Sequence, residues 1–213
     1  MTFVQSSVLM SRIILATGNA HKVEEFQSFL SGTPMECFSA NNYGGMPEVE
    51  ETGTTFRENA LIKAEALRRF LIDSKGLSGG EIPCLLSDDS GLEVDSLQGA
   101  PGVYSARYAG VGASDQDNLN KLLKALAKVP ELERTARFRC VLCLIKEDGL
   151  PKYFEGTCDG RILKQPQGSS GFGYDPVFAP DGYSDSFAQL GALIKARLSH
   201  RAKAMASFVG QQS

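Results

Sequence analysis

Two adjacent carboxylates, Asp88 and Asp89, follow directly on the short apolar run at residues 84–87. Neighbouring negative charges at the end of a buried strand repel each other, and their desolvation is unfavourable unless a cation lies beside them. Magnesium prefers oxygen ligands and is commonly held by one or two carboxylates together with substrate phosphates. The pair therefore indicates either a metal site or an ordinary turn, because Asp and Ser also end strands and begin turns.

A second polar segment could bind phosphate. It lies between the apolar run at residues 12–16 and a helical pattern that begins at Val23, and it consists of Thr17, Gly18, Asn19, Ala20, His21 and Lys22. Glycine permits a close backbone approach, a helix N-terminus presents N–H groups, and Lys22 adds a positive charge. The Walker pattern is absent. The alternative is a simple helix N-cap at Asn19.

Three further groups of residues could complete a nucleotide site. The glycine-rich loop at 168–175 carries Phe172, which could stack on a base, and Asp175, which could accept a hydrogen bond from base N–H groups; a turn with core aromatics is the alternative. The run at 48–51 is acidic, and Glu58 could be a ligand or a capping residue. Near the C-terminus, Lys195 is four residues before Ser199-His200-Arg201, which predicts that Lys195 and Ser199 share a helix face.

Alternating helical and strand patterns must position these residues. Apolar runs predict strands at 12–16, 84–87, 135–145 and 152–158, with a hairpin turn at 147–149. Helices are predicted behind the capping pairs Thr55/Glu58 and Ser114/Asp117, and from 187 to 208 with a break near Gly191. Strand, polar loop and helix in succession predict an α/β fold with a mixed sheet.

The composition restricts the classes of function. The 213 residues carry 22 Lys and Arg against 25 Asp and Glu, so no basic excess favours a nucleic-acid partner. No apolar run approaches the roughly 20 residues that span a membrane. Five cysteines, an odd number, favour a reducing cytoplasm over a disulfide framework. Cys140 and Cys143 form a C-x-x-C, but its place inside an apolar strand favours a structural role.

Six motifs in this order resemble the inosine triphosphate pyrophosphatase family, which cleaves non-canonical purine nucleoside triphosphates. They span about residues 12–208 and are Thr17-Gly18-Asn19-x-x-Lys22, Glu51-Thr52-Gly53-x-Thr55-Phe56-x-Glu58-Asn59-Ala60 with Lys63-Ala64, Asp88-Asp89-Ser90-Gly91-Leu92-x-Val94-Asp95, Gly99-Ala100-Pro101-Gly102-Val103-Tyr104-Ser105-Ala106-Arg107-Tyr108, Phe172-Gly173-Tyr174-Asp175-Pro176 and Ser199-His200-Arg201. The chain departs from the family in one place, because the residues before Lys195 are Gly191-Ala192-Leu193-Ile194 where acidic residues are usual.

The resemblance implies an elongated mixed-sheet α/β fold with two lobes flanking a substrate cleft, and a homodimer in the cytoplasm. Residues 12–213 would form a single nucleoside triphosphate pyrophosphatase domain, with residues 1–11 as a disordered extension. The reaction implied is hydrolysis of the triphosphates of inosine, deoxyinosine and xanthosine to the monophosphate and pyrophosphate, which cleanses the nucleotide pool.

The resemblance also implies roles for individual residues. Asp89 would be the catalytic carboxylate, and Glu51, Asp88 and Asp89 would hold Mg²⁺. The triphosphate would be bound by Thr17, Gly18, Asn19, Ala20, His21 and Lys22, with Ser90 beside the substrate. The base would be bound by Phe172, Gly173, Tyr174, Asp175, Lys195, His200 and Arg201. Arg201 carries only donors, so it would favour bases with an oxygen at C6 over adenine.

Three rival functions remain open at this point. A related pyrophosphatase with a preference for modified pyrimidines would differ in its substrate profile. A nucleotide sensor without turnover would leave bound triphosphate intact, although a cluster of carboxylates is unfavourable for pure phosphate binding. A nucleic-acid-binding protein is disfavoured because no basic stripe is visible.

Overall fold

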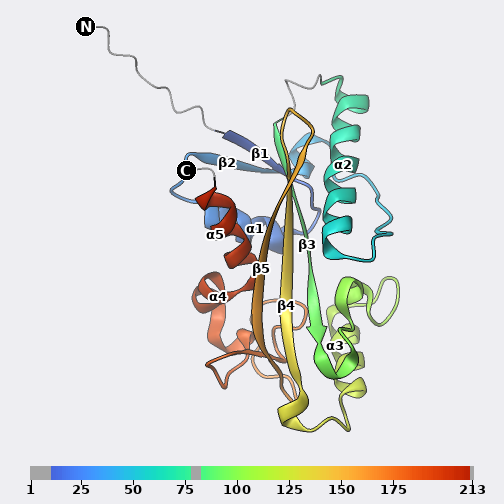
Figure 1. Ribbon diagram of the computed structural model, residues 1–213, viewed down its shortest axis with the longest axis vertical. Coiled ribbons are helices and arrows are strands. Elements are labelled where there is room, and N and C mark those ends of the chain that lie inside the picture. The colour runs from blue at the N-terminus through green and yellow to red at the C-terminus, as the bar shows by residue number, and fades with distance from the viewer. Residues whose placement is uncertain (1–10, 78–82, 212–213) are drawn as a thin grey trace, which may run out of the picture. The chain divides into compact units, whose positions relative to one another are not determined.

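The computed structural model describes residues 11–77 and 83–211. Helices and strands alternate from β1 to β4, and two strands and two helices follow; the order is β1 (Ser11–Leu15), α1 (Ala20–Leu30), β2 (Met35–Ser39), α2 (Phe56–Lys75), β3 (Cys84–Val94), α3 (Asp115–Ala125), β4 (Thr135–Ile145), β5 (Pro151–Ile162), β6 (Phe178–Pro180), α4 (Phe187–Leu198) and α5 (His200–Gly210) (Figure 1). The predicted α/β class is therefore confirmed. The predicted extension at 1–11 lies outside the described residues, except for Ser11, with which β1 begins.

Six strands form one mixed sheet in the order β2-β1-β3-β4-β5-β6, and Figure 1 shows the long strands β3, β4 and β5 running beside one another. Strand β1 pairs in parallel with both β2 and β3, whereas β5 and β6 are antiparallel. The mixed sheet was predicted, and the apolar run in β1 explains part of it. Parallel neighbours on both sides leave Ile13, Ile14 and Leu15 almost completely buried.

Strand β3 is longer than its sequence suggests. The predicted strand ended at Ser87, but β3 continues to Val94, so Asp88 and Asp89 lie in the middle of a strand. The prediction was wrong because polar residues in a strand are tolerated where tertiary partners meet them. Gly91 shows how closely β3 is packed: a Cβ there would lie 2.5 Å from the carbonyl oxygen of Gly102.

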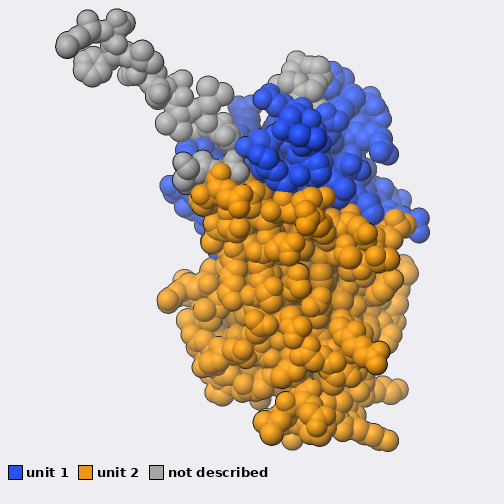
Figure 2. Space-filling view, viewed as in Figure 1, with its two compact units in different colours: residues 1–51, 61–87, 143–152 blue, residues 52–60, 88–142, 153–213 orange. Residues whose placement is uncertain are grey.

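The chain divides into two compact units, which Figure 2 shows in different colours. Unit 1 comprises residues 1–51, 61–87 and 143–152, and unit 2 comprises residues 52–60, 88–142 and 153–213. The core of unit 2 includes the predicted inner face of α3 together with aromatic residues of β4, β6 and α4. Leu119, Leu122 and Leu126 are buried in it, and Leu123 is partly buried.

The C-terminal helix is broken twice. The predicted break at Gly191 is confirmed, because this residue has φ 77° inside α4. A second break at Ser199 was not predicted: the residue adopts an extended conformation, ends α4 and caps α5 by accepting a hydrogen bond from the amide of Ala202. The prediction that Lys195 and Ser199 share a helix face was therefore wrong, and His200 and Arg201 form the first turn of a separate helix.

None of the helices in the described part of the chain combines the length and the apolar character that crossing a membrane requires. All five cysteines have free thiols, and Cys140 and Cys143 of the C-x-x-C pair are both buried in β4.

Candidate active site

The loop between β1 and α1, in unit 1, leads into the exposed N-terminus of helix α1. Asn19 caps α1, as the sequence allowed: its side-chain oxygen accepts a hydrogen bond from the Lys22 amide at 3.2 Å. The Thr17 hydroxyl in turn accepts from the Asn19 amide at 3.1 Å. The first turn of α1 has no acidic residue, and nothing lies within 4 Å of a Cβ built on Gly18. This arrangement favours an anion arriving from solvent.

Two acidic residues near the start of α2, Glu51 and Glu58, have different partners. In unit 1, Glu51 lies 3.6 Å from the ammonium group of Lys63, so its charge is already balanced in part by a cation. In unit 2, Glu58 is a capping residue, since Oε2 accepts hydrogen bonds from the amides of Thr54 and Thr55. These hydrogen bonds lower the pKa of Glu58. The capping alternative for Glu58 is thus confirmed.

A buried, charge-balanced cluster surrounds Asp88 in unit 2. The Arg201 Nε donates to Asp88 Oδ2 at 2.7 Å, and the Ser90 hydroxyl donates to Asp88 Oδ1 at 2.8 Å. Arg201 also donates to the Ser90 oxygen at 2.9 Å, and the Cys140 thiol lies 3.6 Å from Asp88 Oδ2. Asp88 and Arg201 are each only 2% exposed. The cation that the Asp88–Asp89 pair was predicted to need is, for Asp88, an arginine of the protein itself.

Helix α5 is placed for this ion pair by close packing. A Cβ on Gly156 of β5 would lie 2.1 Å from the His200 carbonyl oxygen, so the first turn of α5 rests directly on the strand. The His200 ring stacks on Phe138 with centroids 4.8 Å apart. Ser199 caps the helix and is itself buried. The three residues of the Ser-His-Arg motif therefore have different roles at the start of α5: Ser199 caps the helix, the His200 ring packs on Phe138, and Arg201 is the buried cation.

Asp88 and Asp89 face opposite sides of β3. Asp88 shares a face with Ser90, to which it is hydrogen-bonded, and alternation along the strand turns Asp89 to the face of Gly91 and Glu93. Asp89 is 6% exposed. Within residues 11–77 and 83–211, no group of three or more His, Cys, Asp or Glu side chains could hold a metal ion together.

The glycine-rich loop is held from within by a second buried ion pair in unit 2. Asp175 Oδ2 accepts from Lys195 Nζ at 2.7 Å and from the Phe172 amide at 3.0 Å. The Lys195 ammonium lies 4.3 Å from the centroid of the Phe172 ring. A Cβ on Gly171 would lie 2.1 Å from Asp175 Oδ2, so only glycine fits there. The structure thus brings Phe172, Asp175 and Lys195 together, and Asp175 holds the loop.

Tyr174 anchors the same loop in the core of unit 2. Its hydroxyl donates to the Ser105 carbonyl oxygen at 2.8 Å, and its ring is 5% exposed. Burial raises the pKa of the Tyr174 phenol. The core-aromatic alternative is correct for Tyr174, whereas Phe172 is only partly buried.

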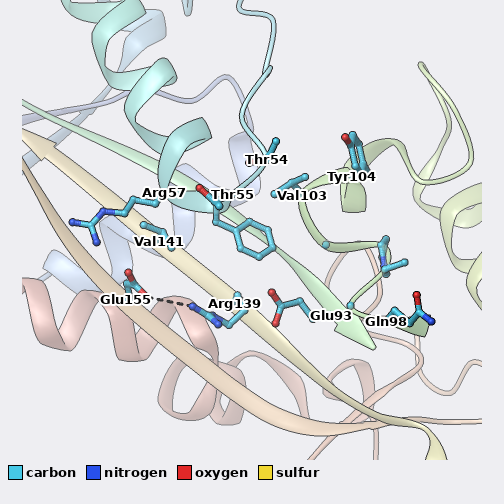
Figure 3. A pocket seen from close by; sticks show the side chains of 15 residues that line it. Thr54, Thr55, Arg57, Glu93, Gln98, Val103, Tyr104, Arg139, Val141 and Glu155 are labelled. Carbon is cyan, nitrogen blue, oxygen red and sulfur yellow. Dashed lines mark hydrogen bonds and ion pairs between the residues drawn. The ribbon is translucent and has the colours of Figure 1, made fainter. Parts of the chain in front are cut away.

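A separate cavity of about 560 Å³ lies wholly within unit 2 (Figure 3). Its wall is formed by the start of α2, the loop at 98–104 and side chains of β3, β4 and β5, among them Arg57, Glu93, Tyr104, Arg139 and Glu155. The Arg139–Glu155 ion pair, 3.2 Å long, crosses its floor. None of the predicted site residues lines this cavity. Asp88 and Ser90 face the other side of β3.

Two contacts of the site could not be found in the sequence. Asp115, in the first turn of α3, accepts a hydrogen bond from the Gly173 amide at 2.7 Å. Cys140 contacts Asp88 across 52 residues of chain. Neither has a sequence signal, because Asp115 reads as an ordinary residue behind the Ser114 cap and Cys140 as an ordinary strand residue.

Comparisons with known proteins show which family the chain resembles along nearly its whole length. A profile of the Ham1 family matches residues 13–211. The chain is 48% identical over 206 residues to a dITP/XTP pyrophosphatase of Vibrio parahaemolyticus, covering 96% of this chain and 98% of that protein. It is 47% identical to a dITP/XTP pyrophosphatase of Opitutus terrae, covering 92% and 95% of the two chains. A HAM1 protein from Coxiella burnetii has a similar structure, with a TM-score of 0.80 at 36% identity, covering 96% of this chain and 100% of that one.

Proposed function

Because the chain belongs to the Ham1 family, we propose that it hydrolyses non-canonical purine nucleoside triphosphates, those of inosine, deoxyinosine and xanthosine, to the monophosphate and pyrophosphate. The observation that carries this proposal is the identity of 48% with a dITP/XTP pyrophosphatase along nearly the whole of both chains. Every site residue predicted from the sequence, from Thr17 to Arg201, falls inside the matched region. The activity removes miscoding nucleotides from the pool.

In this proposal Asp89 orients or deprotonates the water that attacks the α-phosphorus, and pyrophosphate leaves. The contrast between the two carboxylates supports the assignment: Asp88 is fixed by Arg201 and Ser90, whereas Asp89 faces the other side of the strand. A carboxylate already paired with arginine is a poor base, because the cation favours its ionised form. Lys22 and the amides at the start of α1 balance the charge of the leaving group.

Magnesium fits this donor set as an ion carried by the substrate. Asp88 accepts from Arg201 and Ser90, and Glu51 lies beside Lys63, so these two predicted ligands already have protein partners. Magnesium often takes one or two carboxylates and completes its shell with water and phosphate oxygens. We propose Asp89 as a protein ligand of the ion, which would offset the charge of the phosphates when it is bound.

The base is recognised, in this proposal, by stacking on the partly buried ring of Phe172 and by donors at the start of α5. Arg201 as reader of the C6 oxygen stays a prediction, and the structure adds a condition to it. Because the guanidinium already donates to Asp88 and Ser90, it must contact the base and these groups together. Arg201→Ala should then lower the preference for inosine over adenosine triphosphate.

We also propose that the protein acts as a homodimer in the cytoplasm. The five free thiols are compatible with a reducing compartment. Light scattering at several protein concentrations tests the dimer. A monomer at micromolar concentration would contradict it.

Product analysis tests the proposed function. The protein is incubated with magnesium and, separately, with the triphosphates of inosine, xanthosine, adenosine and guanosine, and the nucleotides and pyrophosphate are resolved. Inosine monophosphate with pyrophosphate, and little turnover of the adenosine and guanosine compounds, is the expected result. Diphosphate with orthophosphate would contradict attack at the α-phosphorus, and no turnover of any triphosphate would favour a sensor.

Asp89→Asn tests the assignment of the base, because the amide nearly preserves the shape of the side chain. We expect kcat to fall by about 10²–10⁴-fold, the usual contribution of a general base. Asp159→Asn is the matched control, since this carboxylate lies on the surface of unit 2 with 61% of its side chain exposed. Wild-type kcat in Asp89→Asn would remove Asp89 from this role.

A further inference from the structure

The loop that carries Phe172 is fixed on one side by the body of unit 2. Asp175 accepts from the Phe172 amide and from Lys195, and Tyr174 is anchored in the core through its hydroxyl. These contacts leave Gly173 at the turn of the loop. Gly173 has φ 62°, a left-handed conformation that glycine adopts without strain.

The Gly173 amide is bound by a carboxylate from a different element. Asp115 Oδ2 accepts its hydrogen bond at 2.7 Å, across 58 residues of chain, and both residues belong to unit 2. A hydrogen bond from an amide to an ionised carboxylate is stronger than one between neutral groups. Phe172 is therefore held between two fixed neighbours: Gly173, bound to α3, and the Asp175–Lys195 pair.

The carboxylate of Asp115 does not serve as the cap of α3. The cap is made by Ser114 and Asp117, which form a reciprocal capping box: the Ser114 oxygen accepts from the Asp117 amide, and the Asp117 carboxylate accepts from the Ser114 amide. The negative charge of Asp115 interacts favourably with the dipole of α3, but Asp117 lies in the same turn and interacts with the dipole equally well. The distinguishing feature of Asp115 is its contact with the loop.

We infer that Asp115 is a positioning residue for purine binding, which holds the backbone beside Phe172 so that the ring is preorganised for stacking on the base. The inference rests on the proposed function, because it supposes that a base docks on Phe172. A preorganised ring lowers the ordering cost of binding, so loss of the contact raises KM while leaving the chemical step unchanged.

Three variants separate this role from helix stability. Asp115→Ala removes the acceptor, Asp115→Asn keeps an amide oxygen that can accept the same hydrogen bond, and Asp117→Ala breaks the cap of the same helix without touching the loop. For Asp115→Ala we expect KM for inosine triphosphate to rise about fivefold at unchanged kcat. Asp115→Asn should stay within about twofold of wild type, and Asp117→Ala should leave KM unchanged.

Two further measurements isolate the loop. Amide hydrogen exchange over residues 168–175 should be faster in Asp115→Ala than in wild type and in Asp117→Ala. Inorganic tripolyphosphate, a probe without a base, should inhibit Asp115→Ala and wild type with the same inhibition constant. An equal rise in KM for Asp117→Ala, or unchanged exchange in Asp115→Ala, would overturn the inference.

Failure of the proposed function can be distinguished from failure of the inference about Asp115. If wild type hydrolyses no nucleoside triphosphate, the proposed function is overturned, and the exchange comparison alone decides whether Asp115 positions the loop. If wild type is active and its exchange pattern matches that of Asp115→Ala, the proposed function stands and the role of Asp115 falls.

Discussion

The loop between β1 and α1 and the cluster around Asp88 are both polar and both belong to the predicted site, yet they are built in opposite ways. The loop is exposed, and its hydrogen bonds join residues two or three apart, such as Thr17 with Asn19. The cluster is almost completely buried, and its ion pair joins residues 113 apart, Asp88 and Arg201. One region is organised by local sequence, and the other by the fold.

This difference separates two requirements of nucleotide hydrolysis. A phosphate site must admit a hydrated anion from solvent, so an exposed helix N-terminus with a flexible lysine is suitable. A carboxylate that takes part in chemistry needs a fixed environment with a defined charge. For Asp89, this environment is provided by burial and by the neighbouring Asp88, whose charge is balanced by Arg201. We therefore expect changes in the cluster to affect stability strongly and changes in the loop to affect mainly binding.

The largest effect is expected for Arg201→Ala. Removing the cation leaves Asp88 buried with an uncompensated charge, so the free energy of unfolding should fall by about 3–5 kcal/mol, as measured by urea denaturation. The double variant Asp88→Ala/Arg201→Ala should lose less than the single one, because no charge is left behind. Arg197→Ala is the control, since this arginine is exposed on α4. A loss below about 1 kcal/mol in Arg201→Ala would show that Asp88 is stabilised by other groups.

A smaller effect is expected for Asn19→Ala. The variant removes the cap of α1 and should lower the free energy of unfolding by about 1 kcal/mol, whereas Asn19→Gly should cost only a few tenths. Urea denaturation of the two variants side by side checks this order. Equal losses in both would mean that the cap contributes little and that another contact of Asn19 carries the effect.

Lys22→Ala should weaken substrate binding while leaving stability almost unchanged. The free energy of unfolding should change by less than about 0.5 kcal/mol, because Lys22 lies in the first turn of α1 and is not part of the buried core. KM for inosine triphosphate should rise about tenfold, and its dependence on salt should weaken, because one charge–phosphate contact is lost. Steady-state kinetics at two salt concentrations measures both, with the exposed Lys128→Ala as control. An unchanged KM would remove Lys22 from the phosphate site.

The smallest effect concerns pH and the cap of α2. Hydrogen bonds from Thr54 and Thr55 lower the pKa of Glu58 from its ordinary value of 4.5. A lowered pKa in the folded state contributes stability that is present above pH 4.5 and is lost as the pH falls through the lowered value. The Tm of wild type should therefore exceed that of Glu58→Gln at pH 7, and the gap should narrow below pH 4.5. A gap that stays constant to pH 3 would contradict the cause given for the shift.

Most of the local structure of the site could be predicted from the sequence. The cap at Asn19, the capping pairs Thr55/Glu58 and Ser114/Asp117, and the break at Gly191 are confirmed, because each depends on residues within a few positions. The errors occurred where tertiary partners override local preference. Strand β3 runs through Asp88 and Asp89, where Arg201 of α5 meets the charge of Asp88. Helix α4 ends at Ser199, and the first turn of α5 packs on Gly156.

The sequence by itself determined the order of the motifs, the α/β class, the caps and the residue types available for chemistry. Only the tertiary structure decided how these residues are used: that Asp88 pairs with Arg201, that Asp175 holds the Phe172 loop through Lys195, and that Asp115 binds Gly173. The physical reason is distance along the chain. Capping and turn preferences act within one helical turn, whereas a buried charge is neutralised by whichever residue the packing of strands and helices brings to it.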